Sequence, residues 1–202
     1  STTALLLALG VGDAIVGTAF QDGPVPAEWA DAAAGLTSIS DFVPNEETVL
    51  GLEPDLVFGG WESNFSSEGV GERAELQSLG VNTYVAPSAC RSIQPPKLTW
   101  DAVFADIAEV ASIFRVDASE LIADQQARVD ALLTAQPGLG RTALWYSSGD
   151  DTPYVGAGIG APQLVLETLG LTNIAADVDA TWAPFNWEVV VDADPSVIVL
   201  VD

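Results

Sequence analysis

Two stretches of the chain share one pattern, NEETVLGLEPDLV at residues 45–57 and NWEVVVDADPSVIVLV at residues 186–201. In each, an Asn is followed two residues later by Glu47 or Glu188, and nine residues later by Pro54 or Pro195, which opens an apolar run. Because proline ends helices, each stretch predicts a short helix that leads into a strand. One unit written twice, with different spacing to its neighbours, predicts two related lobes that diverged after a duplication.

Helix and strand patterns alternate on both sides of these stretches. The first half predicts a helix in STTALLLALGVGD that stops at Gly10, a strand in AIVGTAF, a strand in DLVFGG, a helix in GERAELQSLG and a strand in VNTYVAPS. The last part predicts strands in TALWYSS, PYVGA and SVIVLV around the helix APQLVLETLG. Such alternation indicates parallel sheets.

Between these parts lies a helical segment without strands. Val103, Ile107, Val110 and Phe114 fall on one face of a helix, and DASELIADQQARVDALLTA predicts a second helix. We therefore predict an α/β fold of two lobes with mostly parallel sheets, joined by a long helical connection, with a ligand cleft between them. The predicted domains are 1–98, a connector 99–140, and an incomplete second lobe 141–202.

Composition narrows the possible partners. The chain has 202 residues, 49% of them hydrophobic, with a mean hydropathy of +0.30, so it can bury a sizeable core. Its apolar runs are shorter than the roughly 20 residues of a membrane helix. The net charge is −23, from 29 acidic residues against five Arg and one Lys. Such a charge repels phosphate backbones and argues against nucleic acid.

Motifs for catalysis are weak. No His is present, which removes the Ser-His-Asp triad, the Cys-His pair and the usual zinc sites. Cys90 has no His base, and VGAGIGAP at residues 155–162 is more typical of a tight turn than of a dinucleotide loop. SSGDDTP lacks the alternating ligands of a calcium loop. We expect no resident metal or cofactor and no enzyme activity.

Aromatic residues indicate ligand binding instead. Most of them are predicted at strand ends or in loops, and in open α/β sheets ligands bind beyond the carboxyl ends of the strands. Apolar and aromatic walls with a few polar groups suit a bulky, partly planar ligand. Arg91 is the one cation among these loops, so a strongly anionic ligand is disfavoured.

The chain resembles the substrate-binding proteins of ABC importers for iron-siderophores, cobalamin and haem. The resemblance rests on TALLLALGVGDAIVGTA, NEETVLGLEPDLVFGG, ELQSLGVNTYV, LETLGLTNIA and WAPFNWEVVVDADPSVIVL, in the family's order. LGVNTYVAPSACRS is most similar to a branch linked to deazaflavin-cofactor precursors. The family implies an extracytoplasmic solute receptor that delivers its ligand to a permease dimer with ATPase subunits. Members begin with a strand and end with further helices, so both ends of this chain look trimmed, and a lipid anchor or signal would lie upstream.

The resemblance also implies roles for individual residues. Glu47 and Glu188 would dock onto the permease, while their alternative role is to stabilise helix N-termini. The ligand contacts are expected from Phe20, Gln21, Asp22, Asp41, Phe42, Trp61, Glu62, Asn64, Ser88, Cys90, Arg91, Tyr146, Ser147, Trp182, Phe185 and Trp187. The ligand is an organic iron chelate or a corrinoid-like molecule; the alternatives are a deazaflavin precursor, an enzyme acting on a nucleotide through the glycine turn, and a scaffold module without transport.

Overall fold

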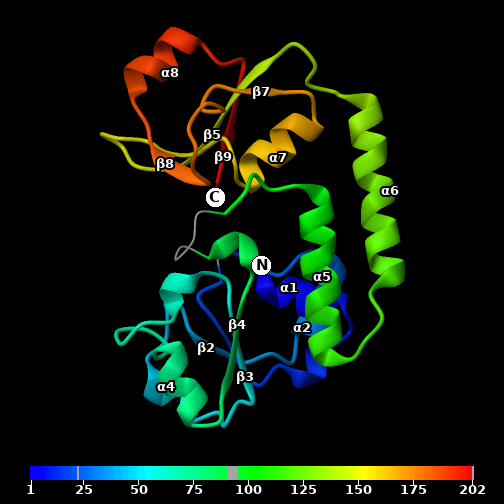
Figure 1. The fold of residues 1–202 in the computed structure, drawn as a ribbon, viewed down its shortest axis with the longest axis vertical. Coiled ribbons are helices and arrows are strands. Elements are labelled where there is room, and N and C mark those ends of the chain that lie inside the picture. Colours follow the sequence, from blue (N-terminus) through cyan, green and yellow to red (C-terminus); the bar gives the residue numbers. More distant parts are fainter. Residues whose placement is uncertain (22, 91–94, 202) are drawn as a thin grey trace. The chain divides into compact units, whose positions relative to one another are not determined.

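The computed structural model describes residues 1–21, 23–90 and 95–201. The chain divides into two compact units, which are traced in Figure 1. Unit 1 comprises Ser1–Pro95 and Asp106–Ala118, and unit 2 comprises Pro96–Ala105 and Ser119–Asp202. Each unit contains helices and strands, so the predicted α/β class with two lobes is confirmed. The boundaries at residues 98 and 140 stay a prediction.

Unit 1 contains two pairs of parallel strands. β1 (Thr18–Ala19) pairs with β2 (Ser38–Ser40), and β3 (Leu56–Gly59) pairs with β4 (Asn82–Val85). The helices are α1 (Thr2–Ala8), α2 (Ala30–Ala33), α3 (Glu46–Leu50) and α4 (Arg73–Ser78), and the 3₁₀ turns are η1 (Gly12–Ala14), η2 (Ala27–Trp29), η3 (Glu62–Asn64) and η4 (Pro87–Ala89). The strand predicted over residues 14–20 is wrong in extent, because η1 occupies its start and the pairing with β2 covers two residues.

The repeated sequence pattern forms the same local structure twice. Asn45 caps α3 by accepting a hydrogen bond from the Thr48 N–H at 2.9 Å, and Asn186 caps α8 (Trp187–Ala193) through the Glu188 N–H at 2.7 Å. Each helix is followed by a strand, β3 or β9 (Val197–Leu200). The repeat therefore encodes a capped helix and its exit into a strand, as the pattern predicted.

The connector consists of two helices, α5 (Trp100–Phe114) and α6 (Ser119–Ala135). They are separated at Arg115, which has a left-handed backbone with φ of +57°. A non-glycine residue in this region interrupts regular helix geometry. The connection is thus not one continuous helix, and α5 contributes residues to both units.

Unit 2 is built on a five-stranded mixed sheet. β5 (Thr142–Ser148) pairs in parallel with β9 and with β7 (Thr172–Asn173), while β6 (Tyr154–Gly156) runs antiparallel to β5 and to β8 (Trp182–Pro184). α7 (Ala161–Thr168) leads from β6 to β7. The expectation of parallel sheets therefore holds for β5, β7 and β9 and is wrong for β6 and β8, because the turn at residues 149–153 is short enough to make a hairpin.

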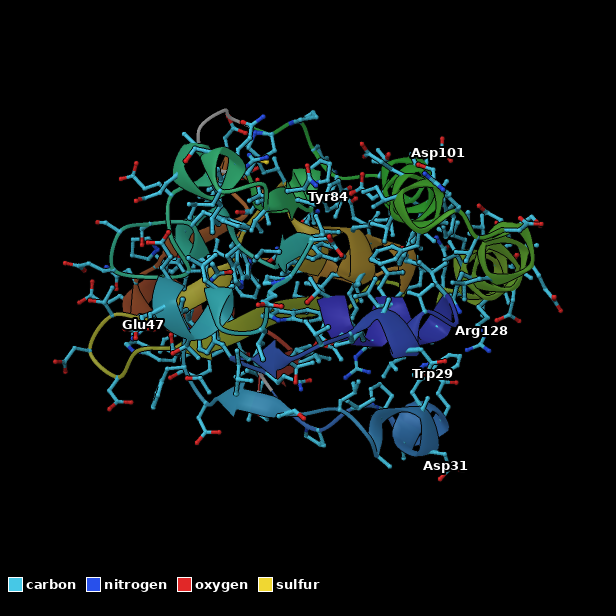
Figure 2. The ribbon with its side chains drawn as sticks, turned by 90° about the horizontal axis from the view of Figure 1, so that it is seen from below. Trp29, Asp31, Glu47, Tyr84, Asp101 and Arg128 are labelled. Atoms are coloured by element: carbon cyan, nitrogen blue, oxygen red, sulfur yellow. The ribbon has the colours of Figure 1, made fainter. Side chains whose placement is uncertain are left out.

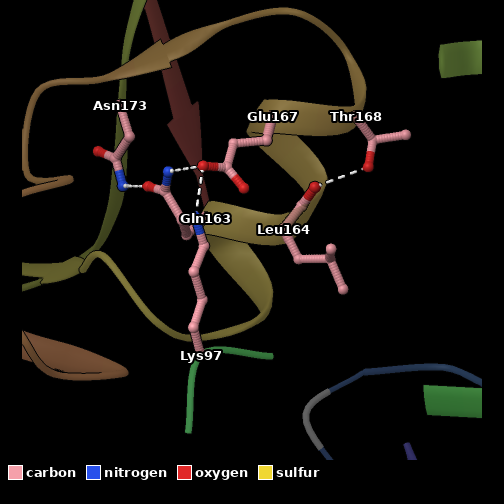
Figure 3. A network of polar contacts seen from close by, with 6 residues as sticks. All are labelled: Lys97, Gln163, Leu164, Glu167, Thr168 and Asn173. Carbon is pink, nitrogen blue, oxygen red and sulfur yellow. Dashed lines mark hydrogen bonds and ion pairs between the residues drawn. The ribbon is translucent and has the colours of Figure 1, made fainter. Parts of the chain in front are cut away.

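A buried polar network holds unit 2 together (Figure 3). Asn173, which is 3% exposed, donates to the Gly156 carbonyl at 3.1 Å and to Gln163 Oε1 at 2.9 Å. Gln163 in turn donates to Glu167 Oε1 at 2.8 Å, and Lys97 Nζ lies 2.6 Å from the same oxygen. Buried amides of this kind are stable only when their bonding groups are satisfied. The network ties the segment before α5 to α7 and β7.

Candidate functional site

The carboxyl ends of the strands in unit 1 open onto a cavity of about 420 Å³. Four of the predicted ligand residues line it, from two neighbouring strand ends: Phe20 and Gln21 follow β1, while Trp61 and Asn64 follow β3. Ala86, which follows β4, lines it as well. The tertiary structure therefore brings residues that are distant in sequence to one site.

Phe20 is held in a strained conformation at this site. Its φ is +49°, in the left-handed region that side chains larger than glycine rarely adopt, and this costs about 1–3 kcal/mol. A hydrogen bond from its N–H to the Ser40 carbonyl, at 3.1 Å, holds the backbone there. The side chain remains 44% exposed. The strained backbone thus displays an aromatic ring at the cavity.

The polar residues of the cavity are fixed by short hydrogen bonds. Gln21 Nε2 donates to Thr18 Oγ1 at 3.1 Å. Asn64 Oδ1 accepts from the Trp61 N–H at 3.0 Å and so closes the turn that carries the Trp61 ring, which is 38% exposed. Preset amides beside exposed rings can orient a partly planar organic ligand by stacking and hydrogen bonding.

Other predicted residues of unit 1 lie outside the cavity lining. Phe42 is 75% exposed, and Asp41 and Glu62 are also absent from the lining, whereas the neighbouring Val43 and Pro44 are part of it. The Cys90 thiol contacts the Ala86 carbonyl at 4.0 Å. Asp22, Arg91 and the Ser88 side chain lie outside the described residues.

Sequence reasoning missed the amino end of α1. Ser1, Thr2 and Thr3 line the cavity together with apolar residues of the unit's interior: Val16, Ile39, Val49, Leu52, Leu56, Val57, Phe58 and Val70. The β-branched and apolar spacing of those strands marks them as core but cannot show that a cavity reaches them.

The predicted aromatic residues of unit 2 are engaged in packing. Tyr146 and Trp187 have ring centroids 5.7 Å apart, and both pack with Phe185 against the buried cluster around Leu144. Trp182 stacks on Tyr154 at 6.4 Å. Tyr146 and Ser147 lie within β5, and Trp182 lies within β8, so the prediction that these residues occupy loops or strand ends is wrong for them.

Glu47 and Glu188 occupy equivalent positions in the two units. Each is exposed and lies in the first turn of its helix, directly after the Asn-capped start, and Figure 2 labels Glu47 on α3. The position suits interaction with the helix dipole and leaves both carboxylates accessible. The two roles expected for them are thus compatible with one another.

The glycine turn before α7 has no room for a phosphate. A Cβ on Gly158 would collide with the Ala176 carbonyl oxygen, and one on Gly160 would meet Thr181 at 2.9 Å. These glycines allow two backbone segments to touch, which is a packing role. The geometry therefore argues against nucleotide binding at this turn.

Titratable groups of the described residues form no metal cluster. In unit 1, Tyr84 donates to Glu109 Oε2 at 3.1 Å, and its ring packs edge-on against Phe58 at 5.0 Å. Burial, assisted by that hydrogen bond, raises the pKa of Tyr84, and burial beside Glu109 raises the pKa of Asp106. These groups stay with their neighbours in the fold and are not among the residues that line the cavity.

Comparison with known proteins gives a consistent result. All of residues 1–202 match the family model of periplasmic binding proteins. A periplasmic binding protein from Veillonella parvula superposes with a TM-score of 0.86 at 27% identity, over 98% of this chain and 67% of that one. An ABC-type Fe3+-hydroxamate transport system protein from Saccharomonospora viridis gives 0.76 at 26% identity, over 99% and 70%.

A more distant structure shares the fold alone. The periplasmic haem binding protein HutB of Vibrio cholerae superposes with a TM-score of 0.73 at 20% identity, over 98% of this chain and 72% of that one. No curated protein sequence matches the chain. No helix among the described residues is long and apolar enough to cross a membrane.

Proposed function

Because the chain belongs to the periplasmic binding protein family, we propose that it is the solute receptor of an ABC importer and that it captures an organic iron chelate or a corrinoid-like molecule. Family membership implies an extracytoplasmic location, and we include in the proposal a lipid anchor that holds the receptor at the membrane. The observation that carries the ligand class is the cavity at the strand ends, with Phe20 and Trp61 beside the amides of Gln21 and Asn64.

The charge of the protein favours particular ligands. Five Arg and one Lys face 29 acidic residues, so the surroundings of any site are negative. A neutral or cationic chelate such as a ferric hydroxamate enters this field at little cost, whereas an anionic catecholate meets repulsion. A deazaflavin precursor is the second candidate, since it is planar and would stack on the same rings. An enzyme of the nucleotide class is disfavoured by the packed glycine turn.

The ligand proposal is tested by titrating intrinsic Trp fluorescence with a ferric hydroxamate, a corrinoid, haem and a deazaflavin precursor. Phe20→Ala and Trp61→Ala should each weaken binding of the responding ligand by about tenfold or more, as expected for exposed aromatic anchors. Leu139→Ala, which removes a side chain that is 71% exposed and absent from the cavity lining, serves as the control. Equal affinities in all four proteins would refute the site.

The contribution of unit 2 is part of the same proposal. Tyr146, Ser147, Phe185 and Trp187 belong to the packed part of that unit, which leaves Trp182 as the residue to test. If unit 2 also contacts the ligand, Trp182→Ala weakens binding without lowering the unfolding midpoint of the protein by a comparable margin. Unchanged affinity would restrict the site to unit 1.

Docking onto a dimeric permease through Glu47 and Glu188 completes the proposal. One exposed ion pair contributes only about 0.2–1 kcal/mol, which suits reversible docking. Reversal of both charges to Lys should abolish stimulation of the transporter's ATPase and leave ligand affinity unchanged. The matched control is Glu120→Lys, an exposed first-turn Glu of α6, which reproduces the effect on a helix dipole. If the control reduces stimulation as strongly, the two glutamates act only on their helices.

A further inference from the structure

The parallel strands of unit 1 form two separate pairs. β1 is bonded to β2, and β3 is bonded to β4, but among the described residues no sheet pairing joins β1 to β3. Thr18 and Phe20 donate toward β2, so Gly17 and Ala19 point their backbone groups away from it. Asp55 accepts from Asn82 in β4, so Leu56 and Phe58 direct theirs to the opposite edge.

Both cavities of unit 1 lie between these two edges. The 420 Å³ cavity is lined by residues 16–21 and 56–61, and a second one of about 290 Å³ is lined by residues 15–19, 53–56 and 58. Successive side chains of a strand point to opposite faces of the sheet. A cavity lined by consecutive residues of a strand therefore borders its backbone edge. The space between β1 and β3 has such an edge on each side.

The order of elements identifies what is missing there. α3 connects β2 to β3, and α4 connects β3 to β4, so each of these helices links two strands of unit 1. α1 leads into β1 in the same way, but no strand precedes it in the described chain. Ser1, Thr2 and Thr3 line the 420 Å³ cavity, and Thr2 and Thr3 also line the smaller one, so the amino end of α1 opens at the gap.

We propose that the gap between β1 and β3 is an acceptor site for one further parallel strand, and that its occupant is the polypeptide leading into Ser1. The strand would join the two pairs into one five-stranded sheet. Because such a strand is central and covered on both faces, it should be a nearly continuous run of Val, Ile and Leu. The Veillonella parvula protein has room for such a segment, since the match covers 67% of its length.

The inference changes the extent of the ligand cavity. A strand in the gap would fill the part lined by Val16, Leu52 and Leu56 and leave the part at the carboxyl ends, near Phe20 and Trp61. It does not depend on which ligand binds, because it concerns the backbone edges alone.

The test uses an extension fused ahead of Ser1. It consists of a Val/Ile-rich strand of about six residues and a loop of about three. The control extension has the same length, with Pro at alternate strand positions, so it lacks half of the N–H donors. Hydrogen exchange of Gly17, Ala19, Leu56 and Phe58 is then compared in the two proteins and in the 202-residue chain.

The expected result is that the apolar extension slows exchange at these four amides by about tenfold or more and raises the unfolding midpoint, while the Pro extension does neither. Equal exchange in both extended proteins overturns the proposal, as does protection that appears only at the outer edges of β2 and β4. Concentration-dependent protection of the 202-residue chain, with dimers in sedimentation, also overturns it, because the occupant is then a second copy. If the fused protein does not fold, the same strand is added as a free peptide, and absence of protection at saturating peptide refutes the site.

Discussion

Asn173→Ala should be among the most destabilising single changes in unit 2. Asn173 makes three buried hydrogen bonds: two as a donor, to Gly156 and Gln163, and one as an acceptor from the Ala175 N–H at 3.0 Å. Each is worth about 0.5–1.5 kcal/mol, and the truncation leaves all three partners without that bond in a buried position. We therefore expect a loss of about 2–4 kcal/mol in the free energy of unfolding.

The loss can be measured by urea denaturation and by the thermal midpoint. For a protein of this size, each kcal/mol shifts the midpoint by about 2–4 °C, so a decrease of roughly 5–15 °C is expected. Asn82→Ala is the matched control, because Asn82 is exposed and its side chain donates one hydrogen bond, to the Asp55 carbonyl at 3.1 Å. Its loss should be under about 1 kcal/mol. If the two variants lose the same stability, the network in Figure 3 does not support unit 2 as argued.

Three further outcomes follow from charge and burial. Partial burial raises the pKa of Glu167, but hydrogen bonds from Lys97 and Gln163 outweigh it and hold that pKa below the ordinary 4.5, so the stability lost in Lys97→Met is full at neutral pH and vanishes as the pH falls below 4.5 in paired denaturation curves. With a net charge of −23, raising KCl from about 0.1 M to about 1 M shortens the Debye length from about 10 to about 3 Å and should raise the free energy of unfolding; a decrease would show that repulsion among the carboxylates does not limit the stability of the fold. Trp145 Nε1 is buried with no hydrogen-bond partner among the described residues, whereas Trp100 Nε1 donates to Thr168 at 2.8 Å, so calorimetry should find Trp145→Phe less destabilising than Trp100→Phe.

The site could be predicted in part. Phe20, Gln21, Trp61 and Asn64 were identifiable because each closely follows a strand pattern, and strand ends of a parallel sheet gather at one edge. The aromatic residues of unit 2 look the same in sequence. What distinguishes Tyr146 is its packing beside Trp187, and that depends on which strands pair.

The local elements of the fold were determined by the sequence alone. Hydrophobic periodicity, the Asn-x-Glu starts and the proline exits act over a few residues, so they predict the two capped helices, the strands β3 and β9, and the presence of two α/β lobes without knowledge of distant contacts. Glycine at position 10 has φ of +72°, which agrees with the predicted end of α1.

Only the tertiary structure decided how those elements combine. The buried bonds of Asn173, the packing role of Gly158 and the unpaired edges of β1 and β3 each join residues far apart in sequence. The physical reason is that hydrogen bonding and close packing act between atoms that the folded backbone brings together. Residue patterns along the chain carry no record of those distances.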